Sequence, residues 1–223
     1  MVSDGVVTVD GVPTVPDGAS AVLDGPTVSG GVFGVETELT EALLRAGFAV
    51  LSSRGCRPLA EERARTVADP QLREIARLAD RVVTMTRWAR HSRHTTGLPI
   101  GYFACSTAVA VALQAAAELD GEVAAVVSSQ GRPDLARSCV PSVTAATLLI
   151  VGGADPVALD HNGAVEPLLR CPRSLEIVSG ASCRFAEPGA LARVIDLAVG
   201  WFGRYLVPTG GEVTGYPLVT GSC

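Results

Sequence analysis

Ser106 is the residue whose surroundings most clearly suggest chemistry. It ends an apolar run, Pro99–Cys105, and an alanine-rich stretch with the pattern of a helix follows at once. A serine on a tight strand-to-helix turn is the setting of a nucleophile elbow, where the residues two positions away must be small because the two backbones nearly touch. Ala104 and Ala108 occupy those positions. The segment predicts a nucleophilic serine, with an ordinary helix-capping serine as the alternative.

The elements that must position Ser106 alternate along the chain. Short β-branched or apolar runs predict strands at Ala21–Leu23, Phe48–Leu51, Pro99–Cys105, Val123–Val127, Thr147–Val151 and Ser174–Val178. Helical patterns lie between them at Glu36–Ala46, Pro70–Arg90, Thr107–Leu119 and Pro188–Leu206. The run Thr147–Val151 is apolar throughout, as expected of a strand buried on both faces. This alternation predicts an α/β fold, with a mostly parallel sheet flanked by helices.

The two ends of the chain carry weaker patterns. Val6–Val15 predicts an edge strand, although Pro13 and Pro16 limit its ladder hydrogen bonds. Residues 207–223 are rich in Gly, Pro and Thr and have no periodicity, which predicts a loosely ordered tail. A length of 223 residues suits one domain with a substantial core. We therefore expect a single α/β domain over residues 1–206.

The composition narrows the classes of partner. The net charge is −5 and the arginines are scattered, so no basic stripe suggests nucleic-acid binding. There is no apolar run long enough for a membrane helix, and the N-terminal residues lack the pattern of a secretory signal. We expect a cytoplasmic protein that binds a small molecule and neither nucleic acid nor membrane. A homodimer is left open.

Two residue types limit the chemistry further. The chain contains no lysine, which excludes a Schiff base and a covalently held pyridoxal cofactor. Its six cysteines show no C-x-x-C or paired Cys/His spacing, so we expect neither a metal site nor a redox motif. In a reducing compartment they are expected to be thiols. We expect no cofactor.

From about Gly11 to Leu206 the chain resembles, element by element, the small dienelactone-hydrolase-like branch of the α/β hydrolases. The best-matching stretches are Gly97–Leu113, Gly121–Leu135, Thr147–Asp155 and Leu175–Leu206. In that family the nucleophile follows the central strand, the acid follows the penultimate strand and the histidine follows the last one. The resemblance implies that Ser106 is the nucleophile and Asp155 the acid. The alternative for Asp155 is a loop aspartate that caps a turn.

The chain departs from the family at the histidine position, where the resemblance places Cys183. A thiol cannot replace an imidazole as a general base, because it holds its proton near neutral pH. The triad is therefore incomplete, and we expect ordinary ester hydrolysis to be crippled. Cys183 itself is a new nucleophile, a packed loop thiol or a disulfide partner for Cys105, and the sequence leaves these three open.

Three histidines could in principle replace the missing base. His91 and His94 precede the strand that begins near Pro99, so they fall at the amino edge of the sheet, whereas ligands bind at the carboxyl edge. His161 follows Asp155 by six residues, which predicts a loop at the correct edge. His161 is the one sequence-plausible replacement base, with a surface histidine at a helix start as the alternative.

A second departure concerns Asp24. The resemblance implies an oxyanion hole near a His-Gly pair after the first core strand, and this chain has Asp24-Gly25 there, followed by Pro26 and Thr27. An ionised Asp24 would repel a developing oxyanion. In an apolar pocket, however, a protonated carboxyl is favoured, and Asp24 becomes a candidate general acid or base. A turn residue in an Asp-Gly pair is the alternative.

The predicted pocket draws on further residues at the same edge. The candidate substrate-binding residues are Cys105, Thr107, Pro26, Thr27, Arg54, Arg132 and His161, and Ser128, Ser129 and Gln130 follow the next core strand. Arg54 and Arg132 could each bind a substrate carboxylate with two hydrogen bonds. Solvation at the surface is the alternative for both.

These features favour an enzyme with a changed reaction. The first hypothesis is a repurposed enzyme that performs cyclisation, dehydration, addition or isomerisation on a small organic substrate by acid–base chemistry with Asp24, Ser106 and Asp155. The second is a residual serine esterase or lactonase. The third is a binding protein without catalysis. The fold alone does not choose among them.

Overall fold

Seven parallel strands form one sheet in this computed structural model, which describes residues 6–7, 20–24, 33–52, 69–92 and 95–206. The strands are β1 (Val6–Val7), β2 (Ser20–Asp24), β3 (Phe48–Ser52), β4 (Ile100–Ser106), β5 (Ala125–Gly131), β6 (Ala146–Gly152) and β7 (Arg173–Val178). Their order is β1-β3-β2-β4-β5-β6-β7, and every neighbouring pair is parallel. The predicted α/β fold with a parallel sheet is confirmed.

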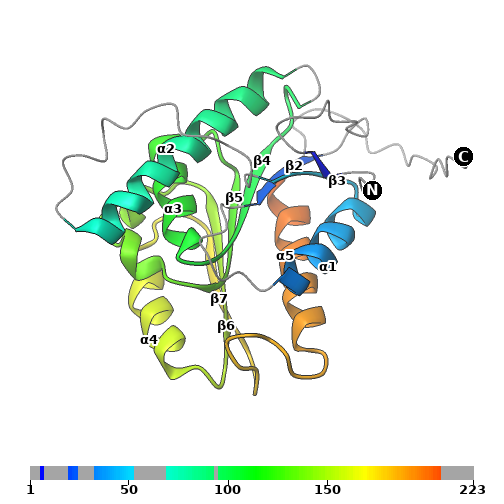
Figure 1. Cartoon of the computed structure of the whole chain (residues 1–223), viewed down its shortest axis with the longest axis vertical. Coiled ribbons are helices and arrows are strands. Elements are labelled where there is room, and N and C mark those ends of the chain that lie inside the picture. The colour runs from blue at the N-terminus through cyan, green and yellow to red at the C-terminus, as the bar shows by residue number, and fades with distance from the viewer. Residues whose placement is uncertain (1–5, 8–19, 25–32, 53–68, 93–94, 207–223) are drawn as a thin grey trace, which may run out of the picture.

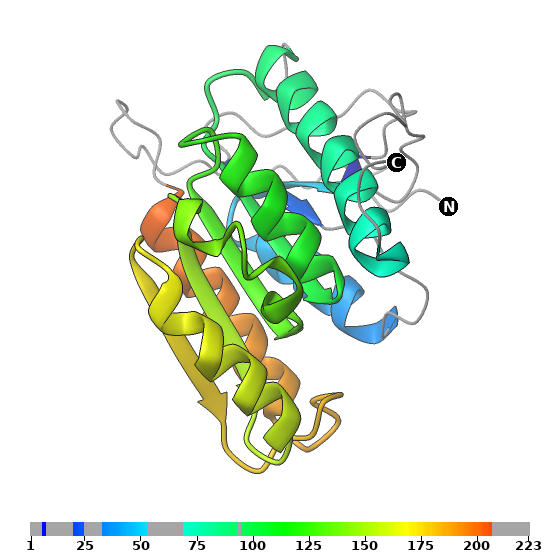
Figure 2. The ribbon, with the colours of Figure 1, turned by 90° about the vertical axis from the view of Figure 1, so that its left-hand side faces the viewer.

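Helices cover both faces of this sheet (Figure 1). They are α1 (Phe33–Arg45), α2 (Pro70–His91), α3 (Ala108–Glu118), α4 (Pro156–Val165) and α5 (Ala190–Tyr205). Helices α2, α3 and α4 lie on one face, and α1 and α5 lie on the other; Figure 2 shows the first of these faces. Two apolar cores result, one on each side of the sheet.

Alternation along β4 explains how the two cores are filled. Tyr102 and Ala104 face the core beneath α2 and α3, whereas Phe103 faces the core beneath α5. Gly101 also faces α5, and a Cβ there would lie 2.7 Å from Cε1 of Phe202. The glycine thus lets the ring of Phe202 press against the sheet.

The strand order locates the binding edge. From β2 the chain crosses to β3 on one side, and from β3 it returns to β4 on the other side of β2. In open parallel sheets, ligands bind at the carboxyl edge beside such a reversal. The reversal places the ends of β2 and β4, at Asp24 and Ser106, on either side of this switch in strand order.

The main differences from the predicted elements lie after β5 and β6. Strand β5 continues to Gly131, so Ser128 and Ser129, predicted to follow the strand, are buried within it. Helix α4 was not predicted, because Asn162 and Gly163 weaken its helical pattern.

At the ends of the chain the structure describes less than was predicted. The predicted N-terminal strand is described as β1, Val6–Val7, and its remaining residues lie outside the described part of the chain, as do residues 207–223. Among the described helices, none combines the length and apolar character that a membrane span requires.

Replacing Phe202 by alanine should remove most of the contact between α5 and the sheet. The ring of Phe202 is fully buried and packs edge-on against Phe48, with ring centroids 6.2 Å apart. We expect a loss of about 3–5 kcal/mol in the free energy of unfolding, measured by urea denaturation. Leu72→Ala, at an exposed position on α2, should change stability by less than about 0.5 kcal/mol. Equal effects of the two substitutions would contradict this packing.

Candidate active site

Ser106 lies at the turn between β4 and α3. It is the last residue of β4, its side chain is exposed, and its backbone has φ = 53°. A non-glycine residue in this left-handed region costs about 1–3 kcal/mol and persists only where the surroundings enforce it. Ala104 and Ala108, the small residues on either side, are buried. The predicted strand-to-helix turn at Ser106 is therefore present, with the strained backbone of a nucleophile elbow.

Asp155 follows β6 and caps the N-terminus of α4. Its Oδ1 accepts a hydrogen bond from the backbone N–H of Ala158 at 3.0 Å, and its Oδ2 accepts one from Nε2 of Gln130 at 3.3 Å. Pro156 occupies the first turn of the helix, where its missing N–H costs nothing. The half-buried carboxylate thus has a fixed orientation beside the positive end of a helix dipole.

Gln130 connects the ends of β5 and β6. Besides donating to Asp155, it accepts a hydrogen bond at Oε1 from the backbone N–H of Gly152 at 2.8 Å. Its backbone is also left-handed, with φ = 49°. Both left-handed residues, Ser106 and Gln130, lie at the carboxyl ends of adjacent strands.

Cys183 lies in the loop between β7 and α5, and this loop is tied to the segment that carries Asp155. The N–H of Gly153 donates to the carbonyl of Val178 at 2.8 Å, and the N–H of Ala154 donates to the carbonyl of Ala181 at 2.9 Å. The thiol of Cys183 is exposed, and neither it nor Cys105, which is half-buried, forms a disulfide. Of the three alternatives for Cys183, the disulfide with Cys105 is absent from this structure and the packed loop thiol is wrong, because the residue is exposed; a nucleophilic role stays a prediction.

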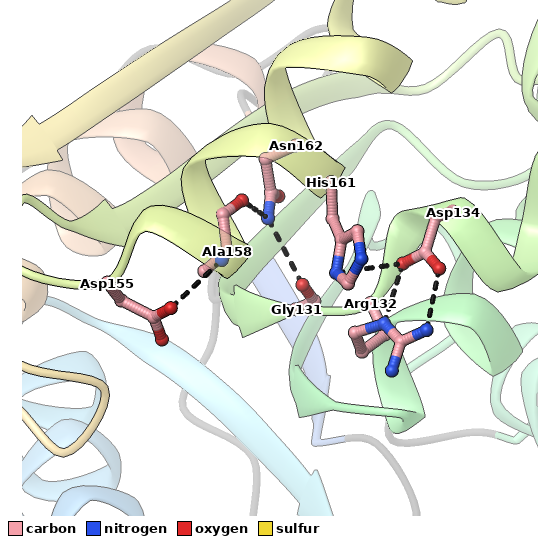
Figure 3. A network of polar contacts seen from close by, with 7 residues as sticks. All are labelled: Gly131, Arg132, Asp134, Asp155, Ala158, His161 and Asn162. Atoms are coloured by element: carbon pink, nitrogen blue, oxygen red, sulfur yellow. Dashed lines mark hydrogen bonds and ion pairs between the residues drawn. The ribbon is translucent and has the colours of Figure 1, made fainter.

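His161 lies in the middle of α4 and is half-buried, so the prediction of a loop histidine is wrong, and the alternative of a surface histidine at a helix start is correct only in that the residue is helical. Figure 3 shows its side chain pointing toward Asp134 and away from Asp155. Its Nδ1 lies 3.8 Å from Oδ1 of Asp134. The next residue, Asn162, donates to the carbonyl of Gly131 at 3.1 Å and so fastens α4 to the end of β5. In this structure, His161 belongs to a contact between α4 and the segment after β5.

The guanidinium of Arg132 binds a carboxylate of this same chain. Its Nε and Nη2 donate to the two carboxylate oxygens of Asp134 at 2.8 and 2.7 Å. These hydrogen bonds hold the pKa of Asp134 below its usual range, with burial opposing and the charges of Arg132 and His161 assisting. The bidentate edge proposed for a substrate carboxylate is thus occupied by Asp134. The backbone N–H of Arg132 donates to the carbonyl of Ser106 at 3.0 Å.

Of the remaining predicted site residues, some are described by the structure and others are not. Thr107 is the half-buried residue between Ser106 and α3. Asp24 ends β2, where its backbone pairs with Phe103 of β4. His91 ends α2 and its Nδ1 contacts the carbonyl of Arg87 at 2.6 Å, at the end of the helix that leads into the start of β4. Pro26, Thr27, Arg54 and His94 lie outside the described residues.

The described part of the chain holds no group of three or more His, Cys, Asp and Glu side chains arranged to bind a metal ion. Ser106, at the end of β4, and Asp155, after β6, both lie at the carboxyl edge of the sheet. A dienelactone hydrolase from Anabaena variabilis is 38% identical, with a TM-score of 0.73 over 86% of this chain and 89% of that chain. The chain belongs to the dienelactone-hydrolase-like family of α/β hydrolases.

Another solved structure shares the α/β-hydrolase fold, and two curated relatives are longer than this chain. An α/β serine hydrolase homologue from Coxiella burnetii has a TM-score of 0.63 at 19% identity, covering 84% of this chain and 86% of that chain, and shows the fold alone. Proteins from two strains of Mycobacterium tuberculosis, CDC 1551 and H37Rv, are 41% identical over 172 residues and carry the provisional name phosphoribosyl transferase. The match covers 77% of this chain but 38% of those longer proteins. No protein-family model matches the chain.

Two parts of this dienelactone-hydrolase-like site were not foreseen from the sequence. Gln130 was predicted only as a pocket residue, because no local pattern marks a left-handed glutamine or its bond to Asp155. Helix α4 could have been found from its start, since Asp155-Pro156 combines a preferred N-cap residue with proline at the first helical position.

Gly152→Ala should disturb the contact between the Asp155 segment and the Cys183 loop. A Cβ at position 152 would overlap the carbonyl oxygen of Ala181 and lie 2.7 Å from that of Ser182. Because both are backbone atoms, the loop must shift, and we expect a loss of about 1–3 kcal/mol in the free energy of unfolding. Urea denaturation measures this loss.

Gly163→Ala is the matched control, because Gly163 lies in α4, where an added Cβ would meet no atom within 4 Å outside the helix backbone, and the change should stabilise the protein by about 0.5–1 kcal/mol. If Gly152→Ala were as stable as the wild type, the two segments would not be packed as described.

Proposed function

We propose that this family member is a repurposed enzyme that performs acid–base chemistry on a small organic substrate and forms no acyl-enzyme. One observation carries the proposal. Ser106 has a left-handed backbone at the end of β4 and Asp155 is held at the start of α4, while the two described histidines contact Arg87 and Asp134. The resemblance assigns the histidine position to Cys183, whose thiol is a poor general base near neutral pH. The serine then lacks the group that would take its proton.

The placement of Asp24 supports a role directed at the substrate. Asp24 pairs with Phe103, and β4 runs three residues further to Ser106. At the rise of a β-strand the backbone of Ser106 therefore lies about 10 Å further along the strand direction than that of Asp24. A small molecule can span this distance. Asp24 would then exchange protons with one part of the substrate while Ser106 binds another.

The proposed chemistry is a proton transfer that needs no co-reactant. The Asp24 carboxylate takes a proton from a carbon next to a substrate carbonyl, and the electron pair left behind moves into the carbonyl group as an enolate. The same carboxyl returns the proton at another position, which gives an isomer and regenerates the carboxylate. Ser106 donates a hydrogen bond to the substrate, and Asp155, held by Gln130 and Ala158, supplies a fixed acceptor.

A residual serine hydrolase is the second candidate, and the left-handed backbone of Ser106 is the observation that favours it. That strained conformation is the one in which a nucleophile elbow presents its hydroxyl. Oxyanion stabilisation and binding alone retain some catalysis when a triad is incomplete. The provisional name of the mycobacterial relatives, phosphoribosyl transferase, is not carried over to this chain, because the match covers 38% of those longer proteins.

Activated esters should be hydrolysed slowly, because Ser106 lacks a base. We expect the turnover of p-nitrophenyl acetate to lie well below the ~10 s⁻¹ typical of enzymes. Cys183→His should raise it partly, since Asp24 still disfavours an oxyanion. The measurement is initial-rate absorbance for wild type, Cys183→His and the control Cys183→Ser, which should show no gain.

Adding Ser106→Ala to Cys183→His should return the rate to the wild-type level. A wild-type turnover of about 10 s⁻¹ or more would contradict the proposal. If His161→Ala abolished that turnover, the residual hydrolase would take its place with His161 as its base.

Asp24→Asn should remove the proposed proton transfer. A panel of small lactones and unsaturated carbonyl compounds in D₂O, followed by NMR, reports deuterium incorporation next to the carbonyl. We expect the wild type to exchange at least one of these compounds, and Asp24→Asn to slow the exchange by about 10²- to 10⁴-fold with little effect on binding. Ser106→Ala should slow it less. Undiminished exchange by Asp24→Asn would contradict the assignment of this residue.

A further inference from the structure

We propose that Gln130 is a positioning residue that orients the Asp155 carboxylate relative to Ser106; this inference rests on the site of the proposed function. The side-chain amide of Gln130 lies between two fixed groups. Its Oε1 accepts from the backbone N–H of Gly152 at 2.8 Å, and its Nε2 donates to Oδ2 of Asp155 at 3.3 Å. The amide thus links the end of β6 to the carboxylate that follows it.

The chemistry of the partners sets the direction of this amide. A backbone N–H can only donate, so the oxygen of Gln130 must face Gly152, and the NH₂ group must then face the carboxylate, which can only accept when ionised. The two contacts therefore support one another. A glutamate at this position would keep the acceptor for Gly152 but would turn a second negative charge toward Asp155.

The backbone conformation of Gln130 would suit a glycine better, which indicates that the glutamine side chain has a role at this position. The residue has φ = 49°, a conformation that glycine adopts without strain and glutamine does not. A strained backbone at the edge of a site is a reason to look for a functional role. A glycine here would avoid the strain but would have no side chain to hold Asp155.

The same segment also supports the serine turn. Ser106 pairs with Gly131, after a register shift that begins at Cys105, and the N–H of Arg132 donates to the carbonyl of Ser106 at 3.0 Å. Three consecutive residues, Gln130 to Arg132, thus contact both the acid and the nucleophile turn. Gln130 thereby sets the position of the Asp155 carboxylate relative to Ser106, without contacting the substrate itself.

The variant Gln130→Gly distinguishes a role in orienting Asp155 from a role in stability alone. It removes the amide and relieves the backbone strain, so the melting temperature should stay equal or rise. Asp120→Gly is the matched control, because Asp120 is an exposed left-handed residue (φ = 26°) on the turn after α3, apart from the site. Gln130→Glu is the nearly isosteric variant with the added charge.

The functional readout is hydrolysis of p-nitrophenyl acetate by these variants in the Cys183→His background. We expect Gln130→Gly and Gln130→Glu to lower kcat by about 10- to 100-fold with KM within about twofold, because a misplaced group costs rate and not affinity. Asp120→Gly should leave both unchanged. Unchanged kcat in Gln130→Gly, or a fall matched by a lower melting temperature that the control shares, would overturn the inference.

A structural readout distinguishes this failure from failure of the proposed function. In ¹⁵N-labelled protein without the Cys183 substitution, Gln130→Gly should shift the amide signal of Ala158, which donates to Asp155, far more than Asp120→Gly does. An unmoved Ala158 signal overturns the role of Gln130. A moved signal, combined with no gain of ester hydrolysis in Cys183→His, supports Gln130 and contradicts the inherited hydrolase site.

Discussion

Two left-handed residues at the ends of adjacent strands are the constraint on which the site depends. Ser106 and Gln130 adopt positive φ values, which neither residue type favours in isolation. They lie where the pairing of β4 and β5 shifts register, between Cys105–Ser129 and Ser106–Gly131, and the rest of these two strands fills both cores. The free energy gained by packing the interior thus offsets the backbone strain at Ser106 and Gln130. Gln130 in turn contacts the acid, Asp155.

The proposed site holds its acid in a fixed orientation but has no histidine at the position that the family resemblance assigns to the base. Asp155 is held by a helix N-terminus and by Gln130, and the Cys183 loop is bonded to the segment that carries Asp155. In serine hydrolases the imidazole connects such an acid to the nucleophile. With a thiol at the position assigned to that imidazole, the geometry can still orient a substrate, while the proton must be moved by another group. A carboxyl at the end of β2 is the group that the proposal names.

The sequence predicted the fold well because the fold follows from periodicity. Apolar runs such as Thr147–Val151 and the helical pattern before Gly121 are local signals, and each was found near its predicted place. The site was predicted only in part, because its contacts join residues far apart in the chain. The bond from Gln130 to Asp155 spans 25 positions, and the direction of His161 depends on the unpredicted helix α4. Neither follows from a local pattern.

The central claim is that Ser106 is not a nucleophile toward esters, and intact-protein mass spectrometry tests it most directly. The protein is mixed with excess p-nitrophenyl acetate, quenched in acid at intervals from milliseconds to minutes, and weighed. We expect that the wild-type protein gains no acetyl group on Ser106, whereas Cys183→His gains one that Ser106→Ala removes. An acetyl group on Ser106 of the wild-type protein would contradict the account.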